Sequence, residues 1–398
     1  MTISTLTTLP GEKLMQFEFA TAGRILFGCG ALNEIGALAR SLGSRALIIT
    51  SNTVSRAQRL QQRLATVEIQ SHTFSLAGEP TLADVLRARE ESQRIGCDLI
   101  IGFGGGSAID AAKAVSAFLT NPGDPLDYLE IIGRGRPLTH PATPCIAIPT
   151  TAGTGAEVTR NAVLGSTEHG VKVSLRSPLL LPRVAIVDPE LTFDLPKALT
   201  ASTGLDALTQ LIEPYVSTRA NTLTDGFCLD GIRRVARSLE KVCTQPHDPA
   251  GREDMSLASL LGGLALTNAG LGAVHGFASP IGGEFKAPHG AVCGALLAAV
   301  MEANIQALRR RNPASASLSR FRYIARLLTG KEEANVDEGV AWVRDLTQRL
   351  DLARLRDLGL RHEHFPSLIE KAIQSNSMKA NPIPLTVTEL KAVLDRAW

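Results

Sequence analysis

The chain has few aromatic residues and no excess of charge of either sign. Aromatic side chains make up 4% of its 398 residues, whereas an all-β sandwich normally contains more of them. Lys and Arg number 41 against 39 Asp and Glu, a net charge of +2, so neither nucleic acid nor an anionic membrane is expected as a partner. Hydrophobic residues at 44% exclude a disordered chain. The composition favours an α/β or α protein, and the length suggests two domains.

The sequence also lacks a cysteine framework and a targeting segment. Its six cysteines form no CxxC pair: Cys29, Cys97, Cys145, Cys228, Cys243 and Cys293. Since a disulfide framework or zinc ribbon needs clustered cysteines, we expect small core residues in a reducing compartment. Residues 1–17 show no basic segment followed by an apolar one, so no signal peptide is predicted. The apolar stretch 257–281 is interrupted by Asn268, His275 and glycines, which argues against a membrane span. We expect a cytoplasmic protein.

The first half of the chain alternates apolar strand patterns with helical patterns. Strands are predicted at 46–50, 98–103, 145–149 and 184–188, and helices at 55–64 and 107–119. Continuous apolar strands separated by helices predict a parallel sheet that is covered on both faces. A β-hairpin is predicted from 161–165 and 171–175, around a polar turn.

The strand pattern stops near residue 189, and helical patterns follow to the end of the chain. Helices are predicted at 196–217, 222–239, 252–266, 289–309, 317–328 and 336–350, with a Pro- and Gly-containing loop at 244–251. We therefore expect an α/β domain over residues 1–190 and an all-helical domain over 191–398.

Three consecutive glycines follow a predicted strand and open a helix. The segment 100–110 reads IIGFGGGSAID, with Gly104, Gly105 and Gly106 ahead of Ser107. Glycines let a diphosphate approach the backbone, and a helix N-terminus offers free N–H groups and a positive dipole end. The spacing from Ser107 to Asp110 also resembles a capping box. The alternative is a Gly-rich turn that binds no ligand.

A second loop of small and hydroxyl residues follows another strand, at 149–157, PTTAGTGAE. Thr150, Thr151 and Thr154 are suited to packing against a ribose or a nicotinamide. The alternative is a tight turn that needs Gly153 and Gly155 for positive φ. The two loops support each other because ligands of parallel sheets bind at the carboxyl ends of the strands.

Polar residues in the helical half form a candidate metal site. Asp206 and Gln210 are four residues apart and share one helix face. His275 and His289 lie in Gly-rich, otherwise apolar surroundings, where polar side chains need partners. One carboxylate and two imidazoles suit Fe²⁺ or Zn²⁺. The alternative for each histidine is a hydrogen-bonded core or cap residue, and spacing alone does not bring Asp206 to either of them.

These segments together resemble the iron-containing (group III) alcohol dehydrogenase family. The matching stretches include GGGSAIDAAKAV, IPTTAGTGAEVT, STGLDALTQLIEPYVS and HGFASPIGGEFKAPHGA, spread from residue 23 to about residue 299. The resemblance implies the dehydroquinate synthase-like architecture, with a Rossmann-like nucleotide-binding domain over 1–190 and an all-α metal-binding, catalytic domain over 191–398. It implies NAD(P)-dependent hydride transfer between a primary alcohol and an aldehyde. Fe²⁺ would be the Lewis acid, with Zn²⁺ or no metal as alternatives.

The resemblance also implies roles for individual residues. The family's cofactor-binding positions fall on Gly104, Gly105, Gly106, Ser107, Asp110, Thr150, Thr151, Thr154 and Lys172. Its metal ligands, which are also the catalytic positions, fall on Asp206, His275 and His289. The remaining ligand, a histidine in the family, is Gln210 here, whose neutral amide is a weaker donor than imidazole.

Two further departures from the family pattern concern the cofactor and the proton. A histidine that often lies near the substrate is replaced by Ser279, which cannot serve as a general base near neutral pH. An Asp that reads the adenosine ribose is replaced within Thr50–Ser51–Asn52. Without that carboxylate at Ser51, NADP(H) becomes possible besides NAD(H).

Three other functions are compatible with the same sequence. One is a metal-independent reductase that resembles maleylacetate reductase. Another is a dehydroquinate-synthase-like lyase, although 200–217 contains no Lys or Arg and 270–294 only Lys286 to meet a polyanionic substrate. A third is a binding module that kept the cofactor loop and lost turnover. As partners we expect a small alcohol or aldehyde and further copies of the chain, in a homodimer or higher homo-oligomer.

Overall fold

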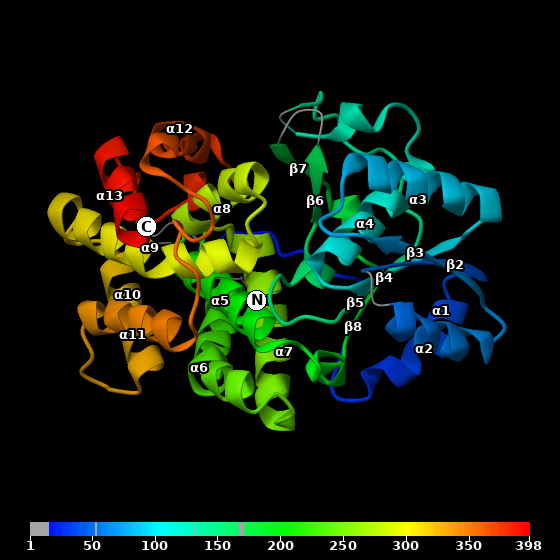
Figure 1. The fold of residues 1–398 in the computed structure, drawn as a ribbon, viewed down its shortest axis with the longest axis horizontal. Coiled ribbons are helices and arrows are strands. Elements are labelled where there is room, and N and C mark those ends of the chain that lie inside the picture. Colours follow the sequence, from blue (N-terminus) through cyan, green and yellow to red (C-terminus); the bar gives the residue numbers. More distant parts are fainter. Residues whose placement is uncertain (1–15, 52–53, 131, 167–170) are drawn as a thin grey trace, which may run out of the picture.

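The computed structural model describes residues 16–398 except 52–53, 131 and 167–170 (Figure 1). Most of the segment inspected for a signal peptide, the residue Asn52, and the turn of the predicted hairpin therefore lie outside the described residues. Figure 1 shows a sheet-containing half at the right and a helical half at the left.

The first half is built on six parallel strands in the order β1-β8-β5-β4-β2-β3. Their bounds are β1 (Ile25–Phe27), β2 (Arg45–Ser51), β3 (Gln70–Leu76), β4 (Leu99–Gly104), β5 (Cys145–Pro149) and β8 (Val184–Val187). The antiparallel hairpin consists of β6 (Asn161–Ser166) and β7 (Val171–Arg176). The parallel sheet and the hairpin confirm the fold that the sequence predicted.

Helices cover both faces of the sheet (Figure 1). One face packs on α1 (Ile35–Arg40) and α2 (Val54–Ala65), the other on α3 (Leu82–Ile95) and α4 (Gly106–Thr120). All six residues of β4 are buried, which is why its sequence is continuously apolar. The edge strand β3 reads QSHTFSL and buries only its last residue, so its sequence carries no apolar run. The three-residue β1 is equally inconspicuous, and neither strand was predicted.

The second half contains nine helices among the described residues. Their bounds are α5 (Lys197–Val216), α6 (Thr222–Thr244), α7 (Pro249–Ala269), α8 (Ala273–Phe285), α9 (His289–Arg311), α10 (Ala316–Thr329), α11 (Val336–Arg349), α12 (Phe365–Gln374) and α13 (Val387–Ala397). Helix α9 is long and apolar enough to cross a membrane, but 78% of its apolar window is buried, as in the core helix of a globular protein.

Three details of this half differ from the sequence-based expectation. The loop predicted at 244–251 is shorter, because Asp248 accepts a hydrogen bond from the Gly251 N–H at 2.7 Å and caps a helix that begins at Pro249. Helix α8 was not predicted, since its glycines and Pro280 obscure the helical pattern. Helices α12 and α13 were not predicted either.

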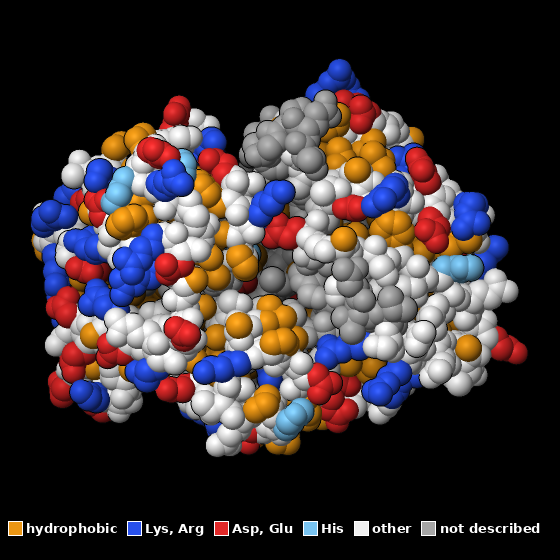
Figure 2. Space-filling view, in the orientation of Figure 1, with side chains coloured by type: hydrophobic (Ala, Val, Ile, Leu, Met, Phe, Trp, Pro, Cys, Tyr) orange, Lys and Arg blue, Asp and Glu red, His pale blue; other side chains and the backbone are white. Residues whose placement is uncertain are grey.

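The two halves meet in backbone-to-backbone contact. Gly155, in the loop after β5, has φ +59°, and a Cβ built on it would lie 2.4 Å from the Cα of Gly263 in α7. A Cβ on Gly263 would lie 2.5 Å from the Gly155 carbonyl oxygen. Neither position has space for a side chain, so the loop after β5 lies directly on the helical half. Figure 2 shows a hollow near the centre of the view where the halves adjoin, with basic and acidic side chains at its upper edge and hydrophobic side chains on the side of the helical half.

Candidate metal centre and cofactor loops

Four side chains from three helices converge in the helical half. Asp206 lies in the middle of α5, His275 in the first turn of α8, and His289 and Cys293 in the first turns of α9. The Asp206 Oδ1 atom lies 3.4 Å from His275 Nε2 and 3.6 Å from His289 Nε2. Cys293 Sγ lies 3.9 Å from His275 Nε2 and 3.6 Å from His289 Nε2. One potential ligand atom from each residue lies within 4.8 Å of the other three.

Close packing of α9 on α5 sets this convergence. A Cβ on Gly290 would lie 2.3 Å from the Ser202 carbonyl oxygen, so only glycine fits there. Because Gly290 directly follows His289, its lack of a side chain lets the start of α9 approach α5. The imidazole of His289 thereby reaches Asp206, which lies one turn beyond Ser202.

Glu213 holds His275 from the side opposite to Asp206. Its Oε2 atom lies 2.7 Å from the Nδ1 atom of His275, and its Oε1 atom accepts a hydrogen bond from the Val274 N–H at 2.7 Å. With Nδ1 held by Glu213, the Nε2 atom is directed to Asp206 and Cys293. Glu213 therefore fixes both the ring of His275 and its tautomer.

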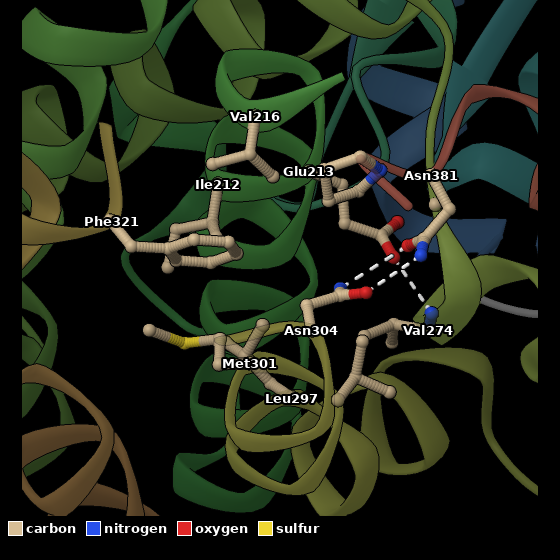
Figure 3. Close-up of a pocket in the computed structure, with 12 residues that line it drawn as sticks. Ile212, Glu213, Val216, Val274, Leu297, Met301, Asn304, Phe321 and Asn381 are labelled. Atoms are coloured by element: carbon tan, nitrogen blue, oxygen red, sulfur yellow. Dashed lines mark hydrogen bonds between the residues drawn. The ribbon is translucent and has the colours of Figure 1, made fainter. Parts of the chain in front are cut away.

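Two asparagines near Glu213 link the start of α8 to α9 (Figure 3). Asn381 accepts from the Ala273 N–H at 3.1 Å and exchanges hydrogen bonds with Asn304 of α9 at 2.7 and 3.2 Å. The cavity beside them is lined by Ile212 and Met301 among others, and its volume of about 10 Å³ is close to that of a single water probe. It is a packing void and has no room for a substrate.

The charges in the cluster favour a cation. Burial alone would raise the pKa of Asp206, but the neighbouring imidazoles of His289 and His275 outweigh it and lower that pKa. Burial alone would lower the pKa of both imidazoles. The negative charges of Cys293 and Asp206 outweigh it, raising the pKa of His289 to about 9 and that of His275 well above its ordinary value. The acidic groups around the two imidazoles therefore favour positive charge at the positions that a metal ion would take.

Unpartnered oxygens also fit a metal ion. Asp206 Oδ1 and Gln210 Oε1 are buried without a hydrogen-bond partner in the described part of the chain. Buried acceptors are costly to leave unpaired, and a divalent ion would satisfy the Asp206 oxygen. The side chain of His289 is 37% exposed, whereas those of Asp206 and His275 are 2% and 7% exposed. The cluster is therefore reached from solvent at His289.

Sequence reasoning brought Asp206, His275 and His289 together as candidates, and the structure places them side by side. It missed Glu213, which follows Asp206 by two helical turns on α5. It also treated Cys293 as an ordinary core thiol. Four of the six cysteines are buried and one is intermediate, but Cys29 is exposed, so the prediction that all six are core residues was wrong for Cys29.

The glycine loop and the threonine loop lie against each other. A Cβ on Gly105 would lie 3.4 Å from Thr151 Oγ1, and one on Gly106 would lie 2.9 Å from Thr154 Oγ1. The Thr150 N–H donates to the Gly104 carbonyl oxygen at 2.9 Å. Both loops thus occupy the carboxyl ends of adjacent strands β4 and β5, where ligands of parallel sheets bind.

Ser51 ends the neighbouring strand β2. A Cβ on Gly104 would lie 3.7 Å from the Ser51 backbone nitrogen and 3.9 Å from its hydroxyl. The Ser51 side chain is therefore beside the glycine loop, and its residue is exposed.

Ser107 does not cap helix α4. The helix begins at Gly106, with Gly105 as its N-cap and no side-chain hydrogen bond there, so the capping-box interpretation was wrong. Asp110 instead pairs with the fully buried Lys113 at 2.8 Å and accepts from the Val163 N–H at 3.0 Å. Through its bond to Val163 of β6, Asp110 anchors the hairpin to α4. The absence of a side-chain cap leaves the N–H groups at Gly106 and Ser107 free for another acceptor.

Lys172, on β7, extends toward the helical half. Its Nζ atom pairs with Glu79 at 2.6 Å and would lie 2.8 Å from a Cβ on Gly282 of α8. Ser279, also on α8, is exposed. Lys172 thus lies where the sheet-containing half faces the helix that carries His275.

Comparisons with known proteins cover nearly the whole chain. The family profile described as iron-containing alcohol dehydrogenase matches residues 22–189, and the profile of the C-terminal part of that family matches residues 200–398. The probable alcohol dehydrogenase EutG of Escherichia coli (strain K12) is 34% identical over 363 residues, 90% of this chain and 88% of that protein.

Solved structures agree with this match. A 1,3-propanediol oxidoreductase superposes with a TM-score of 0.90 and 32% identity, covering 96% of this chain and 100% of that one. The sulfoacetaldehyde reductase from Bifidobacterium kashiwanohense in complex with NAD⁺ superposes with a TM-score of 0.84 and 28% identity, covering 96% and 99%.

Proposed function

The chain belongs to the iron-containing alcohol dehydrogenase family and is an oxidoreductase that acts on CH–OH groups, and from that premise we propose that it interconverts short primary alcohols and aldehydes with NAD(H) or NADP(H). The observation that carries the proposal is the buried, unpartnered Asp206 oxygen beside two imidazole nitrogens. A divalent ion, Fe²⁺ or Zn²⁺, held by Asp206, His275 and His289 would supply a Lewis acid for the alcohol oxygen. The exposure of His289 supports access to it from solvent.

The cofactor is proposed to lie across the glycine and threonine loops. Backbone N–H groups at the start of α4 would bind the diphosphate, and Thr150, Thr151 and Thr154 would contact the ribose or nicotinamide. Lys172 would approach the cofactor from β7. Ser51 carries no charge to repel a 2′-phosphate, which supports acceptance of both NAD(H) and NADP(H).

The chain offers no imidazole at Ser279 to take the alcohol proton. A serine hydroxyl is too weak a base near neutral pH. Because Ser279 is exposed, we propose that the proton leaves to solvent or through the ribose hydroxyls of the cofactor. This proposal assigns Ser279 to the wall of the substrate site rather than to proton transfer.

The test is turnover by the full-length protein with and without metal. The protein is stripped with a chelator, reloaded with Fe²⁺ or Zn²⁺, and assayed with NAD⁺ and NADP⁺ over short primary alcohols. We expect reduced cofactor to accumulate stoichiometrically with oxidised alcohol only after reloading. His275→Ala is expected to lose both metal and activity, whereas the matched control His72→Ala, an exposed position on β3, keeps both. Full activity in the stripped protein or in His275→Ala would instead identify a metal-independent reductase.

A further inference from the structure

We propose that Cys293 is a metal ligand, which adds a thiolate to Asp206, His275 and His289, with the alcohol oxygen entering as a fifth ligand. This inference rests on the proposed metal site and names its fourth protein donor. The family resemblance implied Gln210 for that role, because it occupies the position at which the family has a histidine ligand.

The spacing of the donor atoms fits a single ion. A tetrahedral site with metal–nitrogen and metal–oxygen distances of about 2.0 Å and a metal–sulfur distance of about 2.3 Å separates nitrogen from oxygen by about 3.3 Å and nitrogen from sulfur by about 3.5 Å. The observed separations are 3.4 and 3.6 Å from Asp206 Oδ1 to the two imidazole nitrogens. Those from Cys293 Sγ are 3.9 and 3.6 Å. Four of the edges of a tetrahedron are therefore already near their final lengths.

The position of Cys293 on α9 explains why its sulfur faces the cluster. Cys293 follows His289 by four residues, so both side chains leave the same face of the helix. The thiol is fully buried as part of the hydrophobic core, and its sulfur also contacts the two imidazoles. A cysteine that only filled core volume would have no reason to meet two nitrogen donors and a carboxylate.

Gln210 is placed differently. Its side chain lies one helical turn from Asp206 and contributes to lowering the pKa of that carboxyl, and its Oε1 atom lies 3.5 Å from the position that a Cβ on Gly262 of α7 would occupy. An amide that donates to a carboxylate orients that carboxylate. We therefore assign Gln210 as a positioning residue for Asp206. The resulting donor set of two imidazoles, one carboxylate and one thiolate is softer than a set without sulfur and shifts the metal preference toward Zn²⁺.

The experiment is a Co²⁺ titration of the metal-free, full-length protein, followed by absorption spectroscopy. Thiolate-bound Co²⁺ has an intense near-ultraviolet charge-transfer band that sites with only nitrogen and oxygen donors lack. We expect the wild type to develop this band up to one equivalent of Co²⁺. Cys293→Ser is expected to lose the band and to bind Co²⁺ at least about tenfold more weakly. Cys228→Ser, a fully buried cysteine on α6 outside the site, and Gln210→Ala are both expected to keep the band.

The outcomes separate this inference from the metal site itself. Visible d–d absorption of bound Co²⁺ without the charge-transfer band, or a band that persists in Cys293→Ser, would overturn the role of Cys293 while leaving Asp206, His275 and His289 as ligands. Absence of any Co²⁺ binding to the wild type would overturn both. The wild-type spectrum decides even if Cys293→Ser folds poorly, because Cys293 is the only one of the six cysteines in the cluster. NADH binding by each variant reports that its fold is retained.

Discussion

Glu213 and His275 form a buried pair in which one carboxylate fixes both a ring and a helix terminus. Its Oε2 atom is 2.7 Å from the ring Nδ1 atom, and its Oε1 atom is 2.7 Å from the backbone nitrogen of Val274. The imidazole therefore reaches the metal cluster with its orientation and tautomer already set, so part of the cost of ordering a ligand is met by the fold.

Loss of this pair is expected to weaken metal binding. Glu213→Ala leaves the His275 ring unanchored and should lower the affinity for Zn²⁺ by about 10- to 100-fold, with a smaller effect for Glu213→Gln, whose amide oxygen still accepts from Nδ1. Competition with a chromophoric chelator measures both affinities. Glu302→Ala, which removes a partly exposed carboxylate paired with Arg344 on the surface, serves as the control. Equal affinities in Glu213→Ala and the wild type would contradict the prediction.

A side chain at Gly105 is expected to abolish nucleotide binding. A Cβ there already lies 3.4 Å from Thr151 Oγ1, and the extra methyl groups of Gly105→Val would occupy the space in which a diphosphate meets the backbone. Titration of NADH fluorescence measures the loss, while Co²⁺ binding should stay unchanged. The control is Gly226→Val, at an exposed glycine of α6 with nothing within 4 Å of its Cβ position. Undiminished NADH affinity in Gly105→Val would show that the cofactor binds elsewhere.

A carboxylate at Ser51 is expected to shift cofactor preference toward NAD(H). Ser51→Asp would accept hydrogen bonds from a free ribose and repel a 2′-phosphate. The ratio of kcat/KM with NADP(H) to kcat/KM with NAD(H) should fall at least about tenfold. This corresponds to a change of at least about 1.4 kcal/mol in the difference between the two activation free energies. Ser319→Asp, at an exposed position on α10, adds the same charge far from the loop and should leave the ratio unchanged. If the wild type already rejects NADP(H) by several thousand-fold, another residue reads the ribose.

The buried carboxyl of Glu157 is expected to make stability fall with rising pH. Burial raises its pKa from 4.5 to about 7, against smaller opposing effects of a backbone hydrogen bond and of Lys113. Below pH 4.5 the group is protonated in both states. Between pH 4.5 and 7 only the unfolded chain ionises, so stability is lost through this window by about 3 kcal/mol, and no further loss follows above it.

Glu157→Gln should remove that loss. Urea unfolding at pH 5 and pH 8 measures this effect. The free energy of unfolding of Glu157→Gln minus that of the wild type should be larger at pH 8 than at pH 5. Glu333→Gln, at an exposed position, should show no such rise. A constant difference between Glu157→Gln and the wild type across this range would mean that Glu157 is ionised in the folded protein.

The sequence predicts buried structure better than edges and irregular helices. Strand β4 was predicted because every residue is buried and apolar, whereas β3 at the sheet edge alternates polar residues without a core-facing run. Helix α8 is masked by its glycines and Pro280, which tertiary packing tolerates although helix propensity disfavours them.

The same distinction holds for the metal site. His275 and His289 stand out as polar residues in apolar stretches. Glu213 was detectable as a second acid two turns after Asp206 on a buried helix. Cys293 was not, since a lone cysteine is usually buried as a small hydrophobic residue, and only the packing of α8 against α9 shows its neighbours.

The contact between Gly155 and Gly263 restricts how the enzyme can move. With no side chains between the two backbones, there is nothing compressible to absorb a sliding motion at that point. Any movement of the two halves relative to each other is therefore expected to be a rotation about this contact. The threonine loop lies on the pivot itself, so its distance from the metal cluster is expected to stay nearly constant while the outer rims of the two halves swing apart.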